Sequence, residues 1–198
     1  MNRHEISGVP AVFLDRDGVI NEEVGFVNHE DRFRILPGVA EAIRMLKNAG
    51  CLCVVVTNQP GVGLGVFPES LVLKLHTRMQ AALERDGAAL DGVYYCPHHE
   101  QAVAKAYRCR CPNRKPEPGM LNAAAKDLSI DLSVSYLVGD RGVDMEAAGR
   151  VGVCPILVET GYGKGEWLYR RHTWRHRPVF VAKDLRDAAR WIVAEKGE

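Results

Sequence analysis

Short apolar runs alternate with amphipathic segments along most of the chain, and this alternation constrains its fold more than any other feature. The apolar runs cover residues 12–14, 52–56, 92–95, 135–138 and 155–158, with a weaker one at 179–181. The helical patterns cover residues 37–50, 68–87, 118–128, 145–149 and 184–194. Apolar strands that alternate with helices indicate a parallel sheet covered on both faces. The sequence therefore predicts a doubly wound α/β fold, with one domain over residues 1–198.

Composition and charge exclude several classes of protein. The 198 residues are 46% hydrophobic and carry a formal net charge of +1, so no global charge points to nucleic acid or to a membrane surface. No stretch approaches the ~20 apolar residues that span a bilayer, and residues 1–10 lack the apolar core of a secretory signal. We therefore expect a monomeric cytoplasmic protein with no membrane partner. Segments 96–117 and 159–177 fit neither pattern and are expected to be loops.

Two carboxylates follow the first apolar run directly, in the sequence Asp15-Arg16-Asp17-Gly18. The carboxyl end of a strand is where open α/β folds place their chemistry. One such carboxylate can attack as a nucleophile while the other moves a proton. The alternative is an ordinary charged turn, because Asp-Gly pairs are frequent in turns. The motif alone leaves both interpretations open.

Hydrogen-bond donors and a cation come next along the chain. The second apolar run ends in Thr57-Asn58-Gln59, whose hydroxyl and amides can donate to a phosphate oxygen. Lys115 precedes the helical pattern that starts at residue 118, where its ammonium group can neutralise a phosphoryl group. A polar turn and an ordinary surface lysine are the alternatives for these residues.

Two further carboxylates follow the fourth apolar run. Asp140 comes directly after Val138-Gly139, and Asp144 lies four residues further on. Together with Asp15, Asp140 can provide an all-oxygen site of the kind that suits Mg²⁺. The alternative role for Asp140 is a turn residue or a helix N-cap.

The order of these pieces resembles the four motifs of the haloacid dehalogenase (HAD) superfamily of phosphohydrolases, over residues 11 to about 150. The resemblance implies a Rossmann-like core and an aspartyl-phosphate intermediate. It implies that Asp15 is the nucleophile and that Asp17 is the general acid and then the base. Thr57 and Lys115 would hold the transferring phosphoryl group.

The same resemblance implies a metal site. The Asp15 carboxylate, the backbone carbonyl of Asp17 and the carboxylate of Asp140 would bind catalytic Mg²⁺. Asp144 would orient Lys115 or the metal shell. Charge neutralisation and positioning by such groups are the main sources of phosphatase rate enhancement.

The cysteines of segment 96–117 form a second candidate metal site. Cys96 and His98 form a C-x-H pair, Cys109 and Cys111 form a C-x-C pair, and ten residues separate the two pairs. Three thiolates and one imidazole suit a closed, structural Zn²⁺ site, with His99 as the fallback ligand. The alternatives are a disulfide, a catalytic cysteine and a fortuitous cluster, and the absence of an export signal argues against the disulfide. The zinc would pin this loop and so set the position of the Arg114-Lys115 pair.

The chain leaves little room for a separate cap domain. Only about thirty residues lie between Gly18 and the second apolar run, and one helix takes up much of that length. One helix, one strand and the cysteine-rich loop use the length between Thr57 and Lys115. We therefore expect the site to be covered only by loops 19–35, 60–67 and 96–117, which suits a small phosphorylated metabolite.

Within the superfamily, the chain resembles the zinc-loop subclass, which includes heptose bisphosphate phosphatases and histidinol-phosphatases. Segments 13–21, 91–99, 114–116 and 118–120 resemble the heptose group more closely, which implies removal of the 7-phosphate of D-glycero-D-manno-heptose 1,7-bisphosphate. Loop 60–66 departs from that group because it has no basic side chains. By this resemblance, the substrate contacts would come from Glu23, Val24, Gly25, Phe26, Thr57, Asn58, Gln59, Pro60, Arg114, Lys115 and Arg141.

Segment 164–177 supports a rival hypothesis. Its arginines and aromatic residues interleave, at Arg170, Arg171, Arg175 and Arg177 and at Trp167, Tyr169 and Trp174. Such a pattern can bind single-stranded nucleic acid, so a zinc-loop nucleic-acid-binding module is the non-enzyme alternative and a polynucleotide end phosphatase is an enzymatic one. The near-neutral net charge argues against nucleic acid as a partner, so a solvated loop is expected here.

Overall fold

The computed structural model describes residues 8–197 and contains a six-stranded, all-parallel sheet in the order β3-β2-β1-β4-β5-β6. The strands are β1 (Ala11–Leu14), β2 (Leu52–Asn58), β3 (Gly92–Cys96), β4 (Tyr136–Gly139), β5 (Cys154–Val158) and β6 (Phe180–Ala182). Each strand begins and ends within two residues of its predicted position. The predicted doubly wound α/β fold is therefore confirmed.

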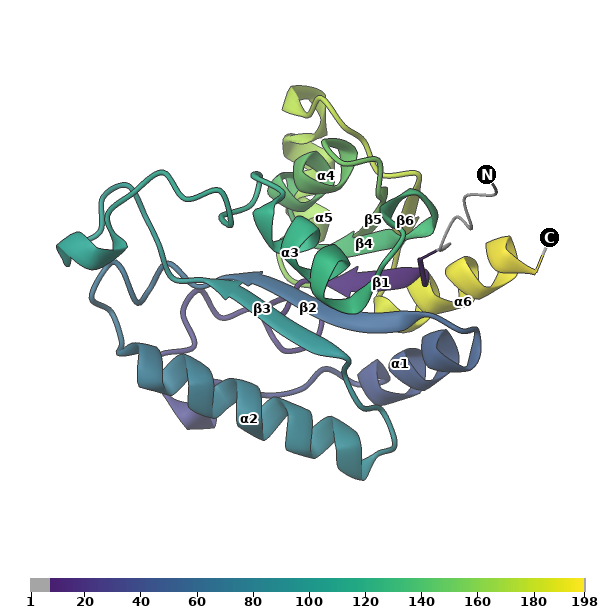
Figure 1. The fold of residues 1–198 in the computed structure, drawn as a ribbon, viewed down its shortest axis with the longest axis horizontal. Coiled ribbons are helices and arrows are strands. Elements are labelled where there is room, and N and C mark those ends of the chain that lie inside the picture. The colour runs from purple at the N-terminus through teal and green to yellow at the C-terminus, as the bar shows by residue number, and fades with distance from the viewer. Residues whose placement is uncertain (1–7, 198) are drawn as a thin grey trace, which may run out of the picture.

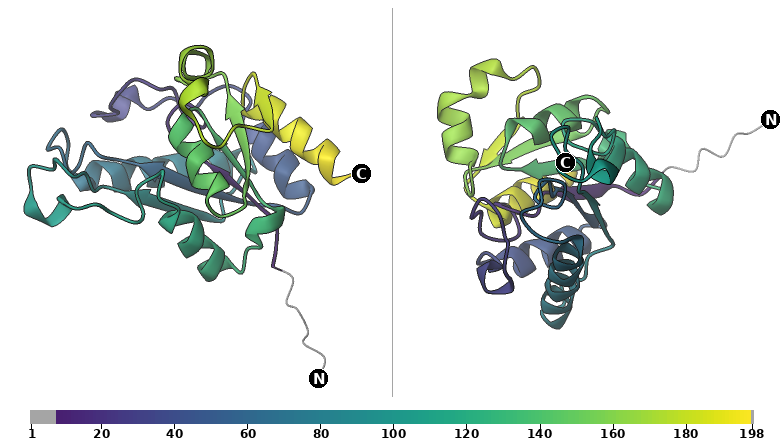
Figure 2. Two further views of the ribbon diagram at one scale, coloured as in Figure 1. Left: turned by 90° about the horizontal axis from the view of Figure 1, so that it is seen from above. Right: turned by 90° about the vertical axis from the view of Figure 1, so that its left-hand side faces the viewer.

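Helices cover both faces of this sheet, as Figures 1 and 2 show. They are α1 (Val39–Asn48), α2 (Glu69–Arg85), α3 (Gly119–Leu128), α4 (Gly142–Gly149), α5 (Gly163–Tyr169) and α6 (Leu185–Lys196). Four short 3₁₀ helices, η1 to η4, cover Glu30–Arg32, Lys105–Tyr107, Leu132–Val134 and Arg171–Thr173. Helices α1, α2 and α6 pack on one face, and α3 and α4 pack on the other.

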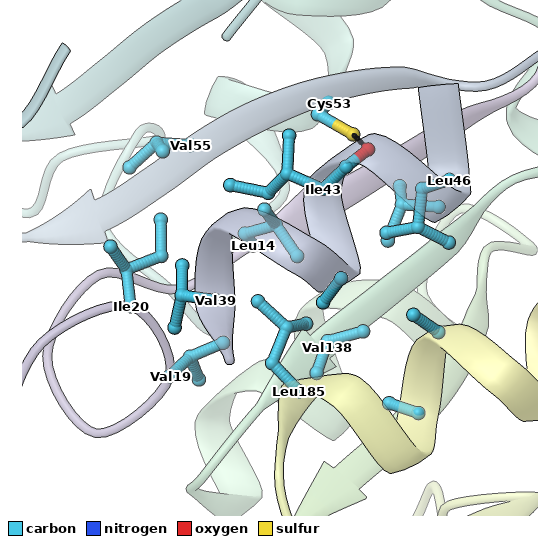
Figure 3. Close-up of a cluster of buried hydrophobic side chains, with 14 of the residues drawn as sticks. Leu14, Val19, Ile20, Val39, Ile43, Leu46, Cys53, Val55, Val138 and Leu185 are labelled. Carbon is cyan, nitrogen blue, oxygen red and sulfur yellow. Dashed lines mark hydrogen bonds between the residues drawn. The ribbon is translucent and has the colours of Figure 1, made fainter. Parts of the chain in front are cut away.

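The alternation of side chains along β1 creates the two cores. Val12 and Leu14 point to the face of α1, α2 and α6, whereas Ala11 and Phe13 point to the face of α3 and α4. Figure 3 shows the first core, in which Leu14 lies close to the α1 residue Ile43. Because β1 is buried on both faces, its sequence is apolar throughout rather than alternating.

The strand order places β1 between β2 and β4, where the winding of the chain reverses. Crevices at such reversals, outside the carboxyl ends of the strands, are the usual ligand sites of open α/β sheets. The register pairs Leu14 with both Val55 and Val138, so the residues that follow these positions meet at one edge. The cysteine-rich segment 96–117 extends from this same edge, as the teal loop in Figure 1 shows.

Segment 159–177 was expected to be a loop, and this prediction was wrong because the segment contains α5 and η4. Glycines at positions 161, 163 and 165 disfavour a helix locally. A tertiary contact overrides them, since the buried Glu166 carboxylate accepts a hydrogen bond from the Gly142 N–H at 3.0 Å. Glu166 also pairs with Arg170 at 3.1 Å.

Two further expectations concern the chain as a whole. No helix within residues 8–197 is long and apolar enough to cross a membrane. The expected lack of a secretory signal core concerns residues 1–10, of which residues 1–7 lie outside the described part of the chain.

Candidate active site

A cavity of about 330 Å³ lies at the carboxyl ends of β1, β2 and β4. Its walls come from the ends of these strands, from the loop after β1, from the end of segment 96–117 and from Tyr162. The lining residues are Asp15, Asp17, Glu23, Gly25, Phe26, Val27, Thr57, Asn58, Gln59, Pro60, Arg114, Lys115, Asp140, Arg141, Val143 and Tyr162. The fold therefore brings together residues that lie up to 147 positions apart in the chain, from Asp15 to Tyr162.

Asp15 lies at the base of the cavity beside a buried cation. Its Oδ2 is 3.0 Å from the Lys115 Nζ, and its Oδ1 accepts a hydrogen bond from the Arg16 N–H at 2.7 Å. Burial raises the pKa of Asp15 from 3.8 to about 6, although Lys115 opposes the shift. The carboxylate is therefore ionised at neutral pH, as a nucleophile must be.

Lys115 is held in place from several sides. Its Nζ is 2.6 Å from the Asp144 Oδ1 and donates a hydrogen bond to the Val56 carbonyl at 2.8 Å. Its backbone N–H donates to the Asn58 Oδ1, and the Asn58 Nδ2 donates to its carbonyl, each at 3.0 Å. Burial opposes its charge, but Asp144 and Asp15 outweigh this effect and raise the pKa of Lys115.

Asp17 points into the same cavity, and donors surround its carboxylate. The Nη2 of Arg16 donates to both oxygens, at 2.9 Å to Oδ1 and 2.8 Å to Oδ2. The Asn21 Nδ2 donates to Oδ1 and the Gln59 Nε2 donates to Oδ2, each at 2.8 Å. The same Gln59 amide donates to the Thr57 Oγ1 at 3.0 Å, which links the end of β2 to the end of β1.

Asp140 completes the acidic edge of the cavity. Its Oδ2 accepts a hydrogen bond from the Tyr162 N–H at 2.8 Å, whereas its buried Oδ1 has no hydrogen-bond partner among residues 8–197. Carboxylate oxygens of Asp15, Asp140 and Asp144 lie within 4.8 Å of one another. Burial raises the pKa of Asp140 to about 9, with a further contribution from the charges of Asp15 and Asp144. A cation at this position would relieve that burial of negative charge.

Ten of the eleven residues proposed as substrate contacts line the cavity, and Val24 does not. The side chain of Val24 packs against the hydrophobic core instead. Arg114 and Arg141 bring positive charge to the rim, and burial together with Arg141 lowers the pKa of Arg114. The Arg141 guanidinium also stacks over the Tyr162 ring, 4.9 Å from its centroid.

Three of the four predicted zinc ligands gather at the end of β3. Possible ligand atoms of Cys96, His98 and Cys111 lie within 4.8 Å of one another, and the Cys96 Sγ is 3.7 Å from the His98 Nδ1. Cys109 is exposed and stands outside this group. The Arg114 Nη1 donates to the His98 carbonyl at 3.3 Å, so this cluster contacts the rim of the cavity directly.

The aromatic residues of segment 164–177 are partly engaged in internal contacts. The Trp167 and Trp174 rings are 6.4 Å apart, and the Arg171 guanidinium lies 4.9 Å from the Trp167 centroid. These contacts cover part of the two tryptophan rings, whereas Tyr169 is 75% exposed.

Several residues of the site were missed at the level of sequence. Tyr162 touches Asp140 through its backbone, and the Thr160 Oγ1 donates to the Gly18 carbonyl at 2.6 Å. Asn21 contacts Asp17 through the turn after β1. No periodicity marks the first two contacts, but the Asp17-to-Asn21 spacing of a short turn could have indicated the third.

Comparisons with known proteins assign the class of this site. A family model described as HAD-hydrolase-like matches residues 112–188. A crystal structure of D,D-heptose 1,7-bisphosphate phosphatase from B. bronchiseptica, complexed with magnesium and phosphate, is similar with a TM-score of 0.82 and 32% identity. That alignment covers 94% of this chain and 99% of the other.

Curated relatives narrow the class to a family. The D-glycero-beta-D-manno-heptose-1,7-bisphosphate 7-phosphatase of Photorhabdus laumondii is 47% identical over 78% of this chain and 82% of its own length. The D-glycero-D-manno-heptose-1,7-bisphosphate 7-phosphatase of Thermosynechococcus vestitus is 42% identical over 92% of this chain and 95% of its own. The chain therefore belongs to the family of heptose bisphosphate phosphatases within the HAD-like hydrolases.

Proposed function

We propose that this enzyme is a Mg²⁺-dependent phosphatase that removes the 7-phosphate of D-glycero-D-manno-heptose 1,7-bisphosphate. The names of its relatives support the substrate, and the buried Asp15–Lys115–Asp144 cluster at the base of the cavity carries the argument for the chemistry. We further propose that the enzyme works as a monomer with a single domain, because the cavity is lined by elements that all belong to one continuous parallel sheet and its connecting loops.

The proposed reaction has two displacements at phosphorus. An Asp15 carboxylate oxygen attacks the phosphorus, the bond from phosphorus to the sugar oxygen breaks, and Asp17 gives its proton to that leaving oxygen. A water molecule then attacks the aspartyl phosphate while Asp17 takes its proton. The bond from phosphorus to Asp15 breaks, which releases phosphate and restores both carboxyl groups.

The phosphoryl group would be held by donors that already line the cavity. Lys115 lies 3.0 Å from Asp15 and would neutralise charge on the phosphoryl oxygens. Thr57 and the amide of Asn58 come from the end of β2 on the same side. Glu23, Gly25, Phe26, Gln59, Pro60, Arg114 and Arg141 would contact the rest of the substrate, and the two arginines are the cations available to its second phosphate.

The acidic edge fits a hard divalent cation. Asp15, the backbone carbonyl of Asp17 and Asp140 would hold Mg²⁺, and the unpartnered, buried Oδ1 of Asp140 supports this assignment. When bound, the ion polarises the phosphoryl oxygens and offsets the negative charge of the carboxylates. Asp144 stays with Lys115, 2.6 Å away, and orients its ammonium group.

The cluster at the end of β3 would hold a structural Zn²⁺. Cys96, His98 and Cys111 are preassembled, and Cys109 lies only two residues before Cys111, so a turn of this exposed residue could supply the fourth ligand. Zinc in this position would stiffen a loop that is poor in apolar contacts. It would thereby fix Arg114 and Lys115 at the cavity.

The test is phosphate release in the presence of Mg²⁺ from both anomers of heptose 1,7-bisphosphate, histidinol phosphate and a 3′-phosphorylated oligonucleotide. We expect a clear preference for a heptose anomer and no turnover by Asp15→Asn, which retains the shape of the side chain. Preference for histidinol phosphate or the oligonucleotide would overturn the assignment of heptose 1,7-bisphosphate as the substrate. A substantially active Asp15→Asn enzyme would overturn the mechanism.

A further inference from the structure

A buried arginine connects the two proposed catalytic carboxylates to the interior of the protein. Arg16 stands between Asp15 and Asp17 in the sequence, and only 1% of it is exposed. Its Nε and Nη2 donate to Asp17, and its Nη1 lies 3.3 Å from the His76 Nε2. Phe33 packs beneath the guanidinium, with its centroid 5.9 Å away. The guanidinium is thus enclosed by an acidic partner, an imidazole and an aromatic ring.

Among the donors to Asp17, Arg16 alone reaches both carboxylate oxygens, whereas Asn21 and Gln59 each reach one. A planar guanidinium that contacts both oxygens sets the plane of the carboxylate. The orientation of Asp17 in the cavity therefore depends on the orientation of Arg16.

The orientation of Arg16 depends in turn on His76, which lies in α2 and is buried. Burial and the charge of Arg16 together lower the pKa of His76 to about 4, so the ring is neutral at physiological pH. A neutral imidazole whose Nε2 faces a guanidinium N–H accepts its hydrogen bond. The ring also meets the Tyr95 ring edge-on, with 5.4 Å between centroids, and Tyr95 donates to Glu69 at 3.0 Å.

We propose that His76 is a positioning residue that acts through Arg16 to aim the Asp17 carboxyl group at the leaving oxygen of the substrate. This inference rests on the proposed role of Asp17 as the general acid. His76 is buried and is not among the residues that line the cavity, so it would act on the substrate only through Arg16 and Asp17. Its single function in this scheme is to accept the hydrogen bond that keeps the guanidinium in the plane of Asp17.

A comparison of two leaving groups tests the proposal, because an acid matters only when the leaving oxygen needs a proton. The sugar alkoxide of heptose 1,7-bisphosphate needs one, whereas 4-nitrophenolate leaves without it. The ratio of kcat on heptose 1,7-bisphosphate to kcat on 4-nitrophenyl phosphate is also independent of the fraction of protein that is folded. We therefore measure this ratio in each variant.

His76→Phe keeps an aromatic ring against Tyr95 but cannot accept a hydrogen bond, and His76→Gln keeps an acceptor. We expect His76→Phe to lower the ratio about tenfold or more, and His76→Gln to stay within about threefold of the parent enzyme. Met79→Leu, at another buried position of α2, is the matched control and should leave the ratio unchanged. If His76→Phe yields too little folded protein, Arg16→Lys makes the same test because lysine cannot hold the plane of the carboxylate.

The outcomes separate this inference from the proposed function. Asp17→Asn should lower the ratio more than any other variant, and an equal loss on both substrates would overturn the acid role of Asp17 itself. If Asp17→Asn lowers the ratio but neither His76→Phe nor Arg16→Lys does, the positioning role is overturned and the acid role stands. A drop in both rates that leaves the ratio unchanged would assign His76 a purely structural role.

Discussion

The carboxylate of Asp140 should destabilise the metal-free enzyme, and its removal provides a quantitative test of the metal site. Only 1% of Asp140 is exposed, and burial together with the charges of Asp15 and Asp144 raises its pKa from 3.8 to about 9. The folded state therefore keeps a proton at pH 7 that the unfolded state releases. A buried acid of this kind lowers the free energy of unfolding of the metal-free protein but provides a ligand for a cation.

The magnitude follows from proton linkage. Because the folded pKa lies above the unfolded value, the group's contribution to stability is complete below pH 3.8 and is lost as the pH rises toward 9. Keeping the proton at pH 7 costs about 4 kcal/mol at 1.36 kcal/mol for each pH unit above 3.8. Asparagine relieves the protonation cost but leaves a buried polar amide in its place, so Asp140→Asn should recover about half of that cost, or about 2 kcal/mol.

The assay is thermal unfolding followed by circular dichroism, first in buffer without added divalent cations. A gain of about 2 kcal/mol should raise the Tm of Asp140→Asn by about 4–8 °C at neutral pH, because the asparagine can still accept the hydrogen bond from the Tyr162 N–H. The difference from the parent enzyme should shrink as the pH falls to 5. Added Mg²⁺ should raise the Tm of the parent enzyme, by about 2.7 kcal/mol of stability at a hundredfold excess over Kd, and should leave the variant unchanged.

Two results would refute this reasoning. A metal-free Asp140→Asn enzyme with the same Tm as the parent, or a lower one, would mean that the buried carboxylate carries no electrostatic cost. A variant that Mg²⁺ stabilises as strongly as the parent would mean that Asp140 does not hold the ion.

Two other predictions concern the catalytic cavity, and one concerns the cysteine cluster at the end of β3. Lys115→Met should abolish turnover and lower the Tm, because the loss of one partner from a buried ion pair costs about 3–5 kcal/mol; an unchanged Tm in circular dichroism would contradict it. Gly18→Ala should abolish both activity and the Mg²⁺-dependent rise in Tm, since its Cβ would overlap the Asp140 Oδ2. Gly50→Ala, at a similar φ of +77° but in open space away from the cavity, should lower the free energy of unfolding by only the ~1 kcal/mol cost of the left-handed conformation. Cys111→Ser should reduce the bound zinc well below one equivalent by metal analysis and make segment 96–117 sensitive to protease. Cys154→Ser, distant from the cluster, is the control and should retain the zinc. Equal zinc contents in both variants would exclude Cys111 as a ligand.

The proposed catalytic residues could be located from sequence because each follows or ends an apolar run. Asp15, Thr57 and Asp140 occupy the carboxyl ends of β1, β2 and β4, and parallel strands bring such ends to one edge whatever the details of packing. The Cys96 and His98 pair could also be located from sequence, because metal ligands recur at fixed short spacings. Local chemistry and strand periodicity were sufficient for these residues.

Other features could not be inferred from local pattern because they depend on contacts between distant segments. Helix α5 forms against local propensity, since Glu166 caps the Gly142 N–H from 24 residues away. Val24 lies in a predicted contact segment but turns its side chain to the core.

The contact between Arg16 and His76 is the clearest example of the difference. The sequence alone determined that two carboxylates flank an arginine at the end of a buried strand, because the apolar run and the turn are local. Only the tertiary structure decided that this arginine is buried, and that a histidine 60 positions away accepts a hydrogen bond from its Nη1. Packing α2 on the sheet removes water from the guanidinium. Its N–H groups then need hydrogen-bond acceptors from the protein, and residues distant in the sequence can supply them only once the chain has folded.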